Sequence, residues 1–208
     1  MIIDLPTVPE VTDERFQMIN DGSTEIETSE LLYAFVRRLK PINVLETGCY
    51  KGISSLYMAK ALRDNGFGHI ETLEIDEGHI QTSQELWNKF QLRDWITATR
   101  IESLEFEPIK QYQFMFLDTE LNLRFHELVK FFPYLDEEGY IFIHDMPNTL
   151  CKGNVNPDHP DFVNYPVGKF PPEFDELLKA DKLRLFHFGS ARGLIGFYKV
   201  KQGDYSWK

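Results

Sequence analysis

The sequence predicts an α/β fold, a single-domain three-layer α/β/α sandwich with a seven-stranded, mostly parallel sheet and a C-terminal antiparallel hairpin. Two observations lead to this prediction. Short apolar runs alternate with segments of helical apolar spacing between residues 43 and 145, as in a doubly wound sheet. Near the C-terminus, "KLRLFHF" and "LIGFYKV" are separated by a short polar stretch around 189–192 and read as a hairpin.

The first elements are predicted around a glycine-containing turn. "TSELLYAFVRRLK" has helical spacing, with an N-cap expected near Thr28 or Ser29, and Pro41 follows its end. Asn43–Thr47 is then predicted as a strand and Ile53–Leu62 as a helix. In an α/β protein, the turn between such a strand and helix is where a cofactor usually lies.

The middle of the chain continues the alternation of strand and helix. "NGFGHIETLEID" predicts a turn and a second strand that ends at the acids Glu74–Asp76. A helix over Ile80–Phe90 and a third strand in "WITATRIES" follow. "YQFMFLD" and "EEGYIFIHD" are solid apolar runs, as expected of buried parallel strands, and each ends in an acid. The segment between them has a helical apolar face at Leu121, Phe125, Leu128, Val129 and Phe132.

Two regions stand outside this alternation. Residues 1–40 are predicted as an N-terminal helical cap. Residues 146–170 are rich in Pro, Asn and Gly and are predicted as a long loop, because these residues discourage regular structure. A loop of this length is usually functional, and we expect a lid over the site.

Composition argues against several classes of function. The net charge of −11 and the pI near 5.0 argue against a nucleic-acid-binding protein, which normally carries a basic face. No stretch approaches the ~20 apolar residues of a membrane helix, and the N-terminus lacks the pattern of a signal peptide. Cys49 and Cys151 lie far apart without metal-type spacing, which favours a reduced, cytoplasmic protein.

These motifs resemble the class I S-adenosylmethionine-dependent methyltransferases, and within them the small O-methyltransferase-like group. The likeness spans Leu31 to Val200 and includes the C-terminal hairpin. Its motifs, in chain order, are Glu46-Thr-Gly48-Cys-Tyr-Lys-Gly52, the acid Glu74, Glu102-Ser103 and Asp118. The resemblance implies a Rossmann-like fold and S-adenosylmethionine as cofactor.

The cofactor roles follow from this resemblance and from the chemistry of each residue. Gly48 permits a sharp turn and close approach of a ligand, and Gly52 opens a helix whose N-terminus can face a carboxylate. Glu46 suits the α-ammonium of the cofactor, Glu74 the ribose hydroxyls, and Glu102 the adenine amino group. The predicted cofactor-binding set is Glu46, Gly48, Tyr50, Gly52, Ser54, Glu74, Ile75, Glu102, Ser103 and Asp118.

The predicted catalytic residues are Asp118, His144 and Asp145, which end two neighbouring strands at the edge where ligands bind. The two carboxylates are also a candidate Mg²⁺ site, similar to that of the catechol-type O-methyltransferases. That family has an Asp-Asn pair after the later strand, whereas Met146 follows Asp145 here.

Several alternatives around this site stay open. Asn148 or His126 could replace the missing Asn, or Asp118 could orient the cofactor while Asp145 caps its loop. Strand alternation places the side chains of His144 and Asp145 on opposite faces. His144 is then either a general base or a packed structural residue, and His126 and His159 are weaker candidate bases.

The function predicted from these features is methyl transfer from S-adenosylmethionine to a small-molecule acceptor at oxygen, by direct displacement at the methyl carbon. One alternative is an NAD-binding Rossmann oxidoreductase, although G-x-G-x-x-G is not present in the turn. Another is a non-catalytic S-adenosylmethionine-binding module. Residues 1–26 are expected to cover the site or to pack on a partner, and a homodimer is one expected assembly.

Overall fold

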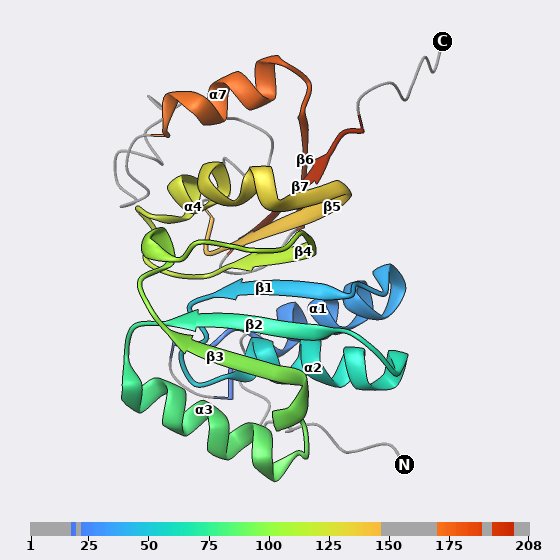
Figure 1. Cartoon of the computed structure of the whole chain (residues 1–208), viewed down its shortest axis with the longest axis vertical. Coiled ribbons are helices and arrows are strands. Elements are labelled where there is room, and N and C mark those ends of the chain that lie inside the picture. The colour runs from blue at the N-terminus through green and yellow to red at the C-terminus, as the bar shows by residue number, and fades with distance from the viewer. Residues whose placement is uncertain (1–17, 20–21, 147–169, 189–192, 202–208) are drawn as a thin grey trace, which may run out of the picture. The chain divides into compact units, whose positions relative to one another are not determined.

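The computed structural model describes residues 18–19, 22–146, 170–188 and 193–201, which form two compact units spanning 1–106 and 107–208 (Figure 1). The strands belong to a seven-stranded mixed sheet in the order β3-β2-β1-β4-β5-β7-β6. The predicted fold class is therefore confirmed. Residues 147–169 of the predicted lid and most of the first half of the predicted cap at 1–40 lie outside the described residues.

The first unit is built on three parallel strands. Its helices and strands are α1 (Ile26–Leu39), β1 (Asn43–Thr47), α2 (Ile53–Asn65), β2 (His69–Glu74), α3 (Glu77–Lys89) and β3 (Ile96–Arg100), with short 3-10 turns at Arg93–Trp95 and Ser103–Glu105. β2 pairs in parallel with β1 on one side and with β3 on the other. The carboxyl ends of β1 and β2 therefore lie next to each other, which places the turns after them at one edge.

Helix α2 is buried along its first three turns. Every residue from Ile53 to Leu62 is buried, because α1 packs against α2 and α2 packs against β2. Helix α1 begins at Ile26, so the expected N-cap at Thr28 or Ser29 is wrong. Both side chains are buried within the first turn, where tertiary packing rather than local capping sets the start of the helix.

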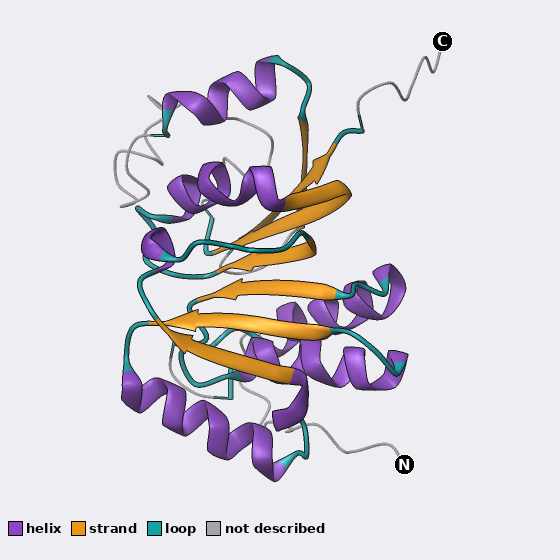
Figure 2. Cartoon of the chain, viewed as in Figure 1, coloured by secondary structure: helices purple, strands orange, loops and turns teal. Residues whose placement is uncertain are grey.

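The second unit contains the strands β4 to β7 of the sheet (Figure 2). Its helices and strands are β4 (Tyr112–Leu117), α4 (Arg124–Phe131), β5 (Leu135–His144), α7 (Pro172–Lys179), β6 (Leu183–Phe188) and β7 (Leu194–Lys199), with a 3-10 turn at Phe132–Tyr134. β4 and β5 are parallel, whereas β7 is antiparallel to both β5 and β6. The predicted hairpin is confirmed, and β4 and β5 are neighbours as expected.

Helix α7 begins just after the predicted loop at 146–170, in a stretch for which no helix was predicted. Its start carries two helix signals, because Pro172 occupies the first turn and Glu173 and Asp175 are acids in that turn. Phe174 is fully buried, and its ring lies 4.8 Å from that of Phe125 on α4. Aromatic packing against α4 therefore stabilises α7 despite its short length and proline-rich approach.

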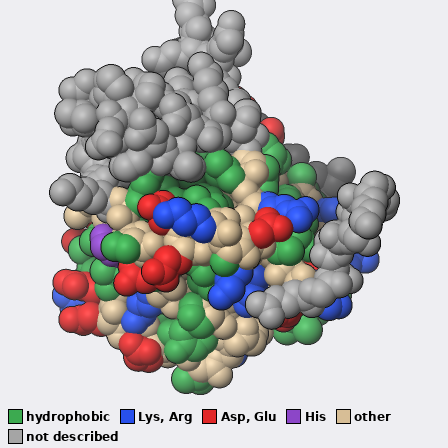
Figure 3. All heavy atoms as spheres, turned by 90° about the horizontal axis from the view of Figure 1, so that it is seen from above, with side chains coloured by type: hydrophobic (Ala, Val, Ile, Leu, Met, Phe, Trp, Pro, Cys, Tyr) green, Lys and Arg blue, Asp and Glu red, His purple; other side chains and the backbone are tan. Residues whose placement is uncertain are grey.

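The described surface carries charged side chains of both signs. On the face drawn in Figure 3, acidic and basic side chains are interspersed rather than gathered by sign. Within the described ranges, every helix is too short or too polar to cross a bilayer.

Candidate functional site

The turn after β1, here called the glycine loop (Gly48–Gly52), has an unusual backbone. Gly48 and Gly52 both have φ of +77°, and Tyr50 between them has φ of +46°. Glycine adopts this left-handed region without steric cost, whereas a residue with a Cβ rarely does. The amide of Gly48 donates to the carbonyl of Leu73 at 2.8 Å, so β2 fixes the point where the loop leaves β1.

Helix α3 holds the other end of the glycine loop. The indole Nε1 of Trp87 donates to the carbonyl of Gly52 at 3.0 Å, and Ser83 Oγ donates to the carbonyl of Tyr50 at 2.9 Å. A Cβ on Gly52 would lie 2.7 Å from Trp87 Nε1 and 2.8 Å from Ser83 Cβ. Gly52 is therefore required both by its φ and by the close approach of α3.

Glu46, the last-but-one residue of β1, is fully buried. One carboxylate oxygen accepts a hydrogen bond from Ser54 Oγ at 2.6 Å, and the other accepts from Ser55 Oγ. These contacts join the end of β1 to the first turn of α2. The assignment of Glu46 to the cofactor's ammonium group, and of Ser54 to its carboxylate, stays a prediction.

Glu74, at the end of β2, binds the backbone around it. Its Oε2 accepts from the amide of Tyr50 at 2.9 Å, and its Oε1 accepts from the amides of Ile75 at 2.9 Å and Asp76 at 3.0 Å. The carboxylate thus links the glycine loop to the turn after β2. Beside it, the Ile75 side chain is 61% exposed, which leaves an apolar surface next to an acceptor carboxylate.

The third turn of the first unit begins at the predicted adenine-binding pair. Glu102 is exposed and precedes the 3-10 turn Ser103–Glu105, and Ser103 is buried. The amide of Ile101 donates to the carbonyl of Glu74 at 3.0 Å, so this turn is attached to the end of β2. The structure therefore gathers the predicted residues of the first three strands at consecutive, connected turns.

Cys49 in the glycine loop is a buried thiol. Burial, followed by the nearby charge of Glu46, raises its pKa to about 12. Because the thiolate is the reactive form of cysteine, Cys49 is a neutral packing residue at physiological pH rather than a nucleophile.

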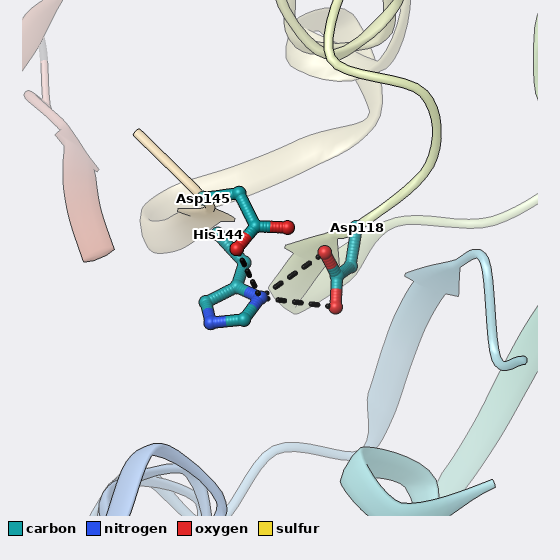
Figure 4. Close-up of side chains that lie close together, drawn as sticks. All are labelled: Asp118, His144 and Asp145. Atoms are coloured by element: carbon teal, nitrogen blue, oxygen red, sulfur yellow. Dashed lines mark hydrogen bonds and ion pairs between the residues drawn. The ribbon is translucent and has the colours of Figure 1, made fainter. Parts of the chain in front are cut away.

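In the second unit, Asp118, His144 and Asp145 form a compact group, here called the Asp–His–Asp cluster (Figure 4). Asp118 directly follows β4, and His144 ends β5. His144 Nδ1 lies 3.2 Å from both carboxylate oxygens of Asp118 and 3.6 Å from Asp145 Oδ1. His144 is fully buried, and the two carboxylate side chains are each 14% exposed.

The expectation that His144 and Asp145 point to opposite faces is wrong. β5 ends at His144, and Asp145 has φ of +54°, in the left-handed region. Strand alternation therefore stops at His144, and the turn brings the Asp145 carboxylate back beside the imidazole (Figure 4). A non-glycine residue in this conformation is often found at functional sites.

Arg124, the first residue of α4, is a part of this site that the sequence analysis missed. Its Nη2 lies 3.0 Å from Asp118 Oδ1 and 3.3 Å from Asp145 Oδ2. Nε and Nη2 also donate to the carbonyl of Thr119, at 2.9 and 2.5 Å, and Nη1 donates to the carbonyl of His144. The sequence did carry one signal for this contact. Arg124 is a cation that stands shortly after Asp118, the acid that ends a buried strand, and at the start of a helix with an apolar face.

The cluster offers ligand atoms of the kind a metal needs. One atom from each of its three residues lies within 4.8 Å of the others. However, the Arg124 guanidinium already contacts both carboxylates, and a divalent cation there would be held close to a fixed positive charge. As arranged, these residues do not fit Mg²⁺. The Mg²⁺ site stays a prediction, and the contacts of Arg124 with both carboxylates argue against it.

The proposed substitutes for the missing Asn ligand do not change this result. His126 is exposed on α4 and is not a member of the cluster. Asn148 lies outside the described residues, as does His159.

Comparison with known proteins identifies the fold. The family described as "Methyltransferase domain" matches residues 45–146, from the middle of β1 to just past the end of β5. The chain has the fold of the class I methyltransferases. The resemblance inferred from the sequence is therefore confirmed, and residues 45–146 are the part of the chain that matches this family.

Solved structures of methyltransferases share this fold at low sequence identity. The O-methyltransferase TomG from Streptomyces achromogenes, in complex with S-adenosylmethionine, matches with a TM-score of 0.69 and 15% identity, over 86% of this chain and 82% of that one. The O-methyltransferase from Bacillus cereus, in complex with S-adenosylhomocysteine, has a TM-score of 0.68 and 17% identity, over 86% and 84% of the two chains.

A third similar structure is also a methyltransferase. The S-adenosylhomocysteine-bound methyltransferase PaMTH1 from Podospora anserina has a TM-score of 0.64 and 20% identity, over 84% of this chain and 78% of that one. No curated protein sequence matches this chain.

Proposed function

We propose that this methyltransferase domain transfers a methyl group from S-adenosylmethionine to an oxygen atom of a small-molecule acceptor. The observation that carries the proposal is the arrangement at the ends of β1 and β2. A left-handed glycine loop is held there against an acceptor carboxylate, Glu74, with the exposed apolar side chain of Ile75 beside it. Two of the similar structures are O-methyltransferases with S-adenosylmethionine or S-adenosylhomocysteine bound.

Each residue of the first unit has a role in this proposal that suits its chemistry. The Glu74 carboxylate accepts from the ribose hydroxyls, and the Ile75 side chain packs on the adenine. Gly48 allows the backbone to approach the cofactor closely, and Gly52 and Ser54 begin the helix whose N-terminus faces a carboxylate. Bound S-adenosylmethionine supplies an electrophilic methyl group, so the protein's main task is to orient donor and acceptor.

The Asp–His–Asp cluster is proposed to handle the acceptor's proton. An acceptor hydroxyl becomes a better nucleophile when a positioned base removes its proton. His144 is the base in this proposal, and Asp118 orients its ring through Nδ1, to which it lies at 3.2 Å. Asp145 and Arg124 complete the charge balance around the ring.

Calorimetric titration with S-adenosylhomocysteine and with NAD tests the cofactor. The proposal predicts saturable, stoichiometric binding of S-adenosylhomocysteine and no binding of NAD. Binding of NAD alone would favour the oxidoreductase alternative. Incubation with labelled S-adenosylmethionine and a panel of hydroxylated and amine-bearing small molecules then tests the reaction. A protein that binds the cofactor but methylates no member of a broad panel would favour a non-catalytic binding module.

Substitution of Glu74 by alanine should weaken S-adenosylhomocysteine binding. Hydrogen bonds to a charged group contribute about 1.5–3 kcal/mol, so the dissociation constant should rise roughly 10- to 150-fold. Glu74→Gln keeps one acceptor oxygen and should give a smaller loss. Glu77→Ala is the matched control, because it removes an equal charge from an exposed position three residues away. Equal affinities for Glu74→Ala and Glu77→Ala would place the ribose elsewhere.

A cytoplasmic location and a homodimer remain part of this proposal. The first rests on the cysteine usage and the second on the expected role of the N-terminal residues. Light scattering coupled to gel filtration measures the mass in solution, and a mass of 24.4 kDa would exclude the dimer.

A further inference from the structure

The second unit places a cation at the pair of carboxylates that the sequence analysis proposed as a Mg²⁺ site. Arg124 Nη2 bridges the two carboxylates of the Asp–His–Asp cluster, at 3.0 Å from Asp118 and 3.3 Å from Asp145. We propose that the Arg124 guanidinium is the permanent cation of this cluster and takes the place of a divalent metal. Arg124 is thus a positioning residue of a metal-independent site.

The guanidinium is fixed in this position by backbone groups. Nε and Nη2 donate to the carbonyl of Thr119, which follows Asp118, and Nη1 donates to the carbonyl of His144. The side chain is only 4% exposed, so it is not a mobile surface cation that happens to meet two acids. Its planar fork of donors matches this arrangement of oxygen acceptors, which a lysine would not satisfy in full.

A second layer of contacts supports Thr119. Thr119 Oγ1 donates to Glu127 Oε1 at 2.8 Å, and Glu127 is a fully buried carboxylate one turn along α4 from Arg124. The same helix therefore supplies both the cation and the residue that orients its carbonyl partner. The position of the guanidinium is therefore set by contacts that α4 itself provides, and not by incidental side-chain packing.

The electrostatic consequence is exclusion of divalent metals. Arginine stays protonated in proteins, so it cannot make room for a metal by losing its charge. A divalent cation bound to the oxygens of Asp118 and Asp145 would lie within a few ångström of the guanidinium, and the interior dielectric screens that repulsion weakly. The two carboxylates are therefore already compensated, and the cluster should have little affinity for Mg²⁺ or Mn²⁺.

Titration with Mn²⁺ tests the inference without any enzyme assay. The full-length protein, freed of metal with EDTA and dialysed, is titrated with Mn²⁺ while free Mn²⁺ is followed by electron paramagnetic resonance. Wild type should show no binding that depends on Asp118, so its titration should match that of Asp118→Asn. Arg124→Gln, which removes the charge and keeps the acids, should bind Mn²⁺ at least about tenfold more tightly than wild type.

Two further variants make the result specific to the charge of Arg124. Arg124→Lys keeps a cation and should show no gain in Mn²⁺ affinity. The double variant Asp118→Asn/Arg124→Gln should lose the gain seen with Arg124→Gln. Circular dichroism checks that each variant is folded. If Arg124→Gln does not fold, the comparison of Mn²⁺ binding by wild type and by Asp118→Asn still tests the inference. Saturable Mn²⁺ binding to wild type that Asp118→Asn abolishes would overturn the inference, as would a folded Arg124→Gln with no gain.

The inference concerns the chemistry of the site in the proposed function, yet the two can fail separately. The proposed function fails if S-adenosylhomocysteine does not bind or no acceptor is methylated. The inference about Arg124 fails only on the Mn²⁺ titrations. Once an acceptor is known, undiminished turnover in EDTA is a further expected result.

Discussion

Replacement of Gly48 by valine should weaken S-adenosylhomocysteine binding by at least about 100-fold. Gly48 has φ of +77°, where a β-branched residue is strained, and strain of this kind costs about 1–3 kcal/mol. The loop must shift to relieve the strain, and the backbone surface proposed to contact the cofactor shifts with it. Calorimetric titration measures the affinity, and circular dichroism checks that the variant keeps its secondary structure.

Gly66 offers a matched control for this substitution. It also has a left-handed backbone, with φ of +84°, but it caps the C-terminus of α2, and a Cβ there would meet no atom within 4 Å. Gly66→Val therefore carries similar backbone strain at a place remote from the glycine loop. It should lower stability while cofactor affinity stays near that of wild type. Unchanged affinity in Gly48→Val, or equal losses in both variants, would contradict the assignment of the loop.

Replacement of Trp87 by alanine should lower the free energy of unfolding by about 3–5 kcal/mol, the range for large-to-small substitutions of buried aromatic residues. Trp87 is fully buried on α3, and its indole donates to the carbonyl of Gly52. The substitution leaves a cavity and removes a partner of the glycine loop. Urea unfolding followed by circular dichroism measures the change.

Trp87→Phe separates the two contributions of this side chain. Phenylalanine keeps most of the buried ring but has no N–H to donate, so its cost should be about 1–2 kcal/mol. If the hydrogen bond holds the loop in its binding conformation, Trp87→Phe should also weaken S-adenosylhomocysteine binding measurably. If Trp87→Phe lost as much stability as Trp87→Ala, packing of the ring would not be the main contribution of Trp87 to the free energy of unfolding.

Most of the fold was predictable because the sequence carries the patterns that buried parallel strands require. "YQFMFLD" and "EEGYIFIHD" are apolar on both faces, since helices cover both sides of such strands, and each ends in an acid where the sheet meets solvent. These patterns predicted β4 and β5, and the apolar runs "KLRLFHF" and "LIGFYKV" predicted the terminal hairpin. The start of α1 was missed because burial of Thr28 and Ser29, which local sequence does not encode, extends the helix toward its N-terminus.

The candidate site was predictable in part, for a physical reason. Parallel strands bring their carboxyl ends to one edge, so Asp118 could be placed near His144 and Asp145 from topology alone. The left-handed turn at Asp145 could not, because nothing in the neighbouring residues demands it. Arg124 could not be placed either, because its role depends on two carbonyl groups whose directions are set by tertiary structure.

The contacts that hold the glycine loop also bear on the kinetics of binding. Trp87 and Ser83 on α3 and Glu74 at the end of β2 hold the loop through hydrogen bonds to its backbone. A ligand that enters there meets a surface that is already ordered, so little conformational entropy is lost on association. Binding should therefore proceed in a single kinetic phase without a slow isomerisation, and variation in affinity among loop variants should appear mainly in the dissociation rate.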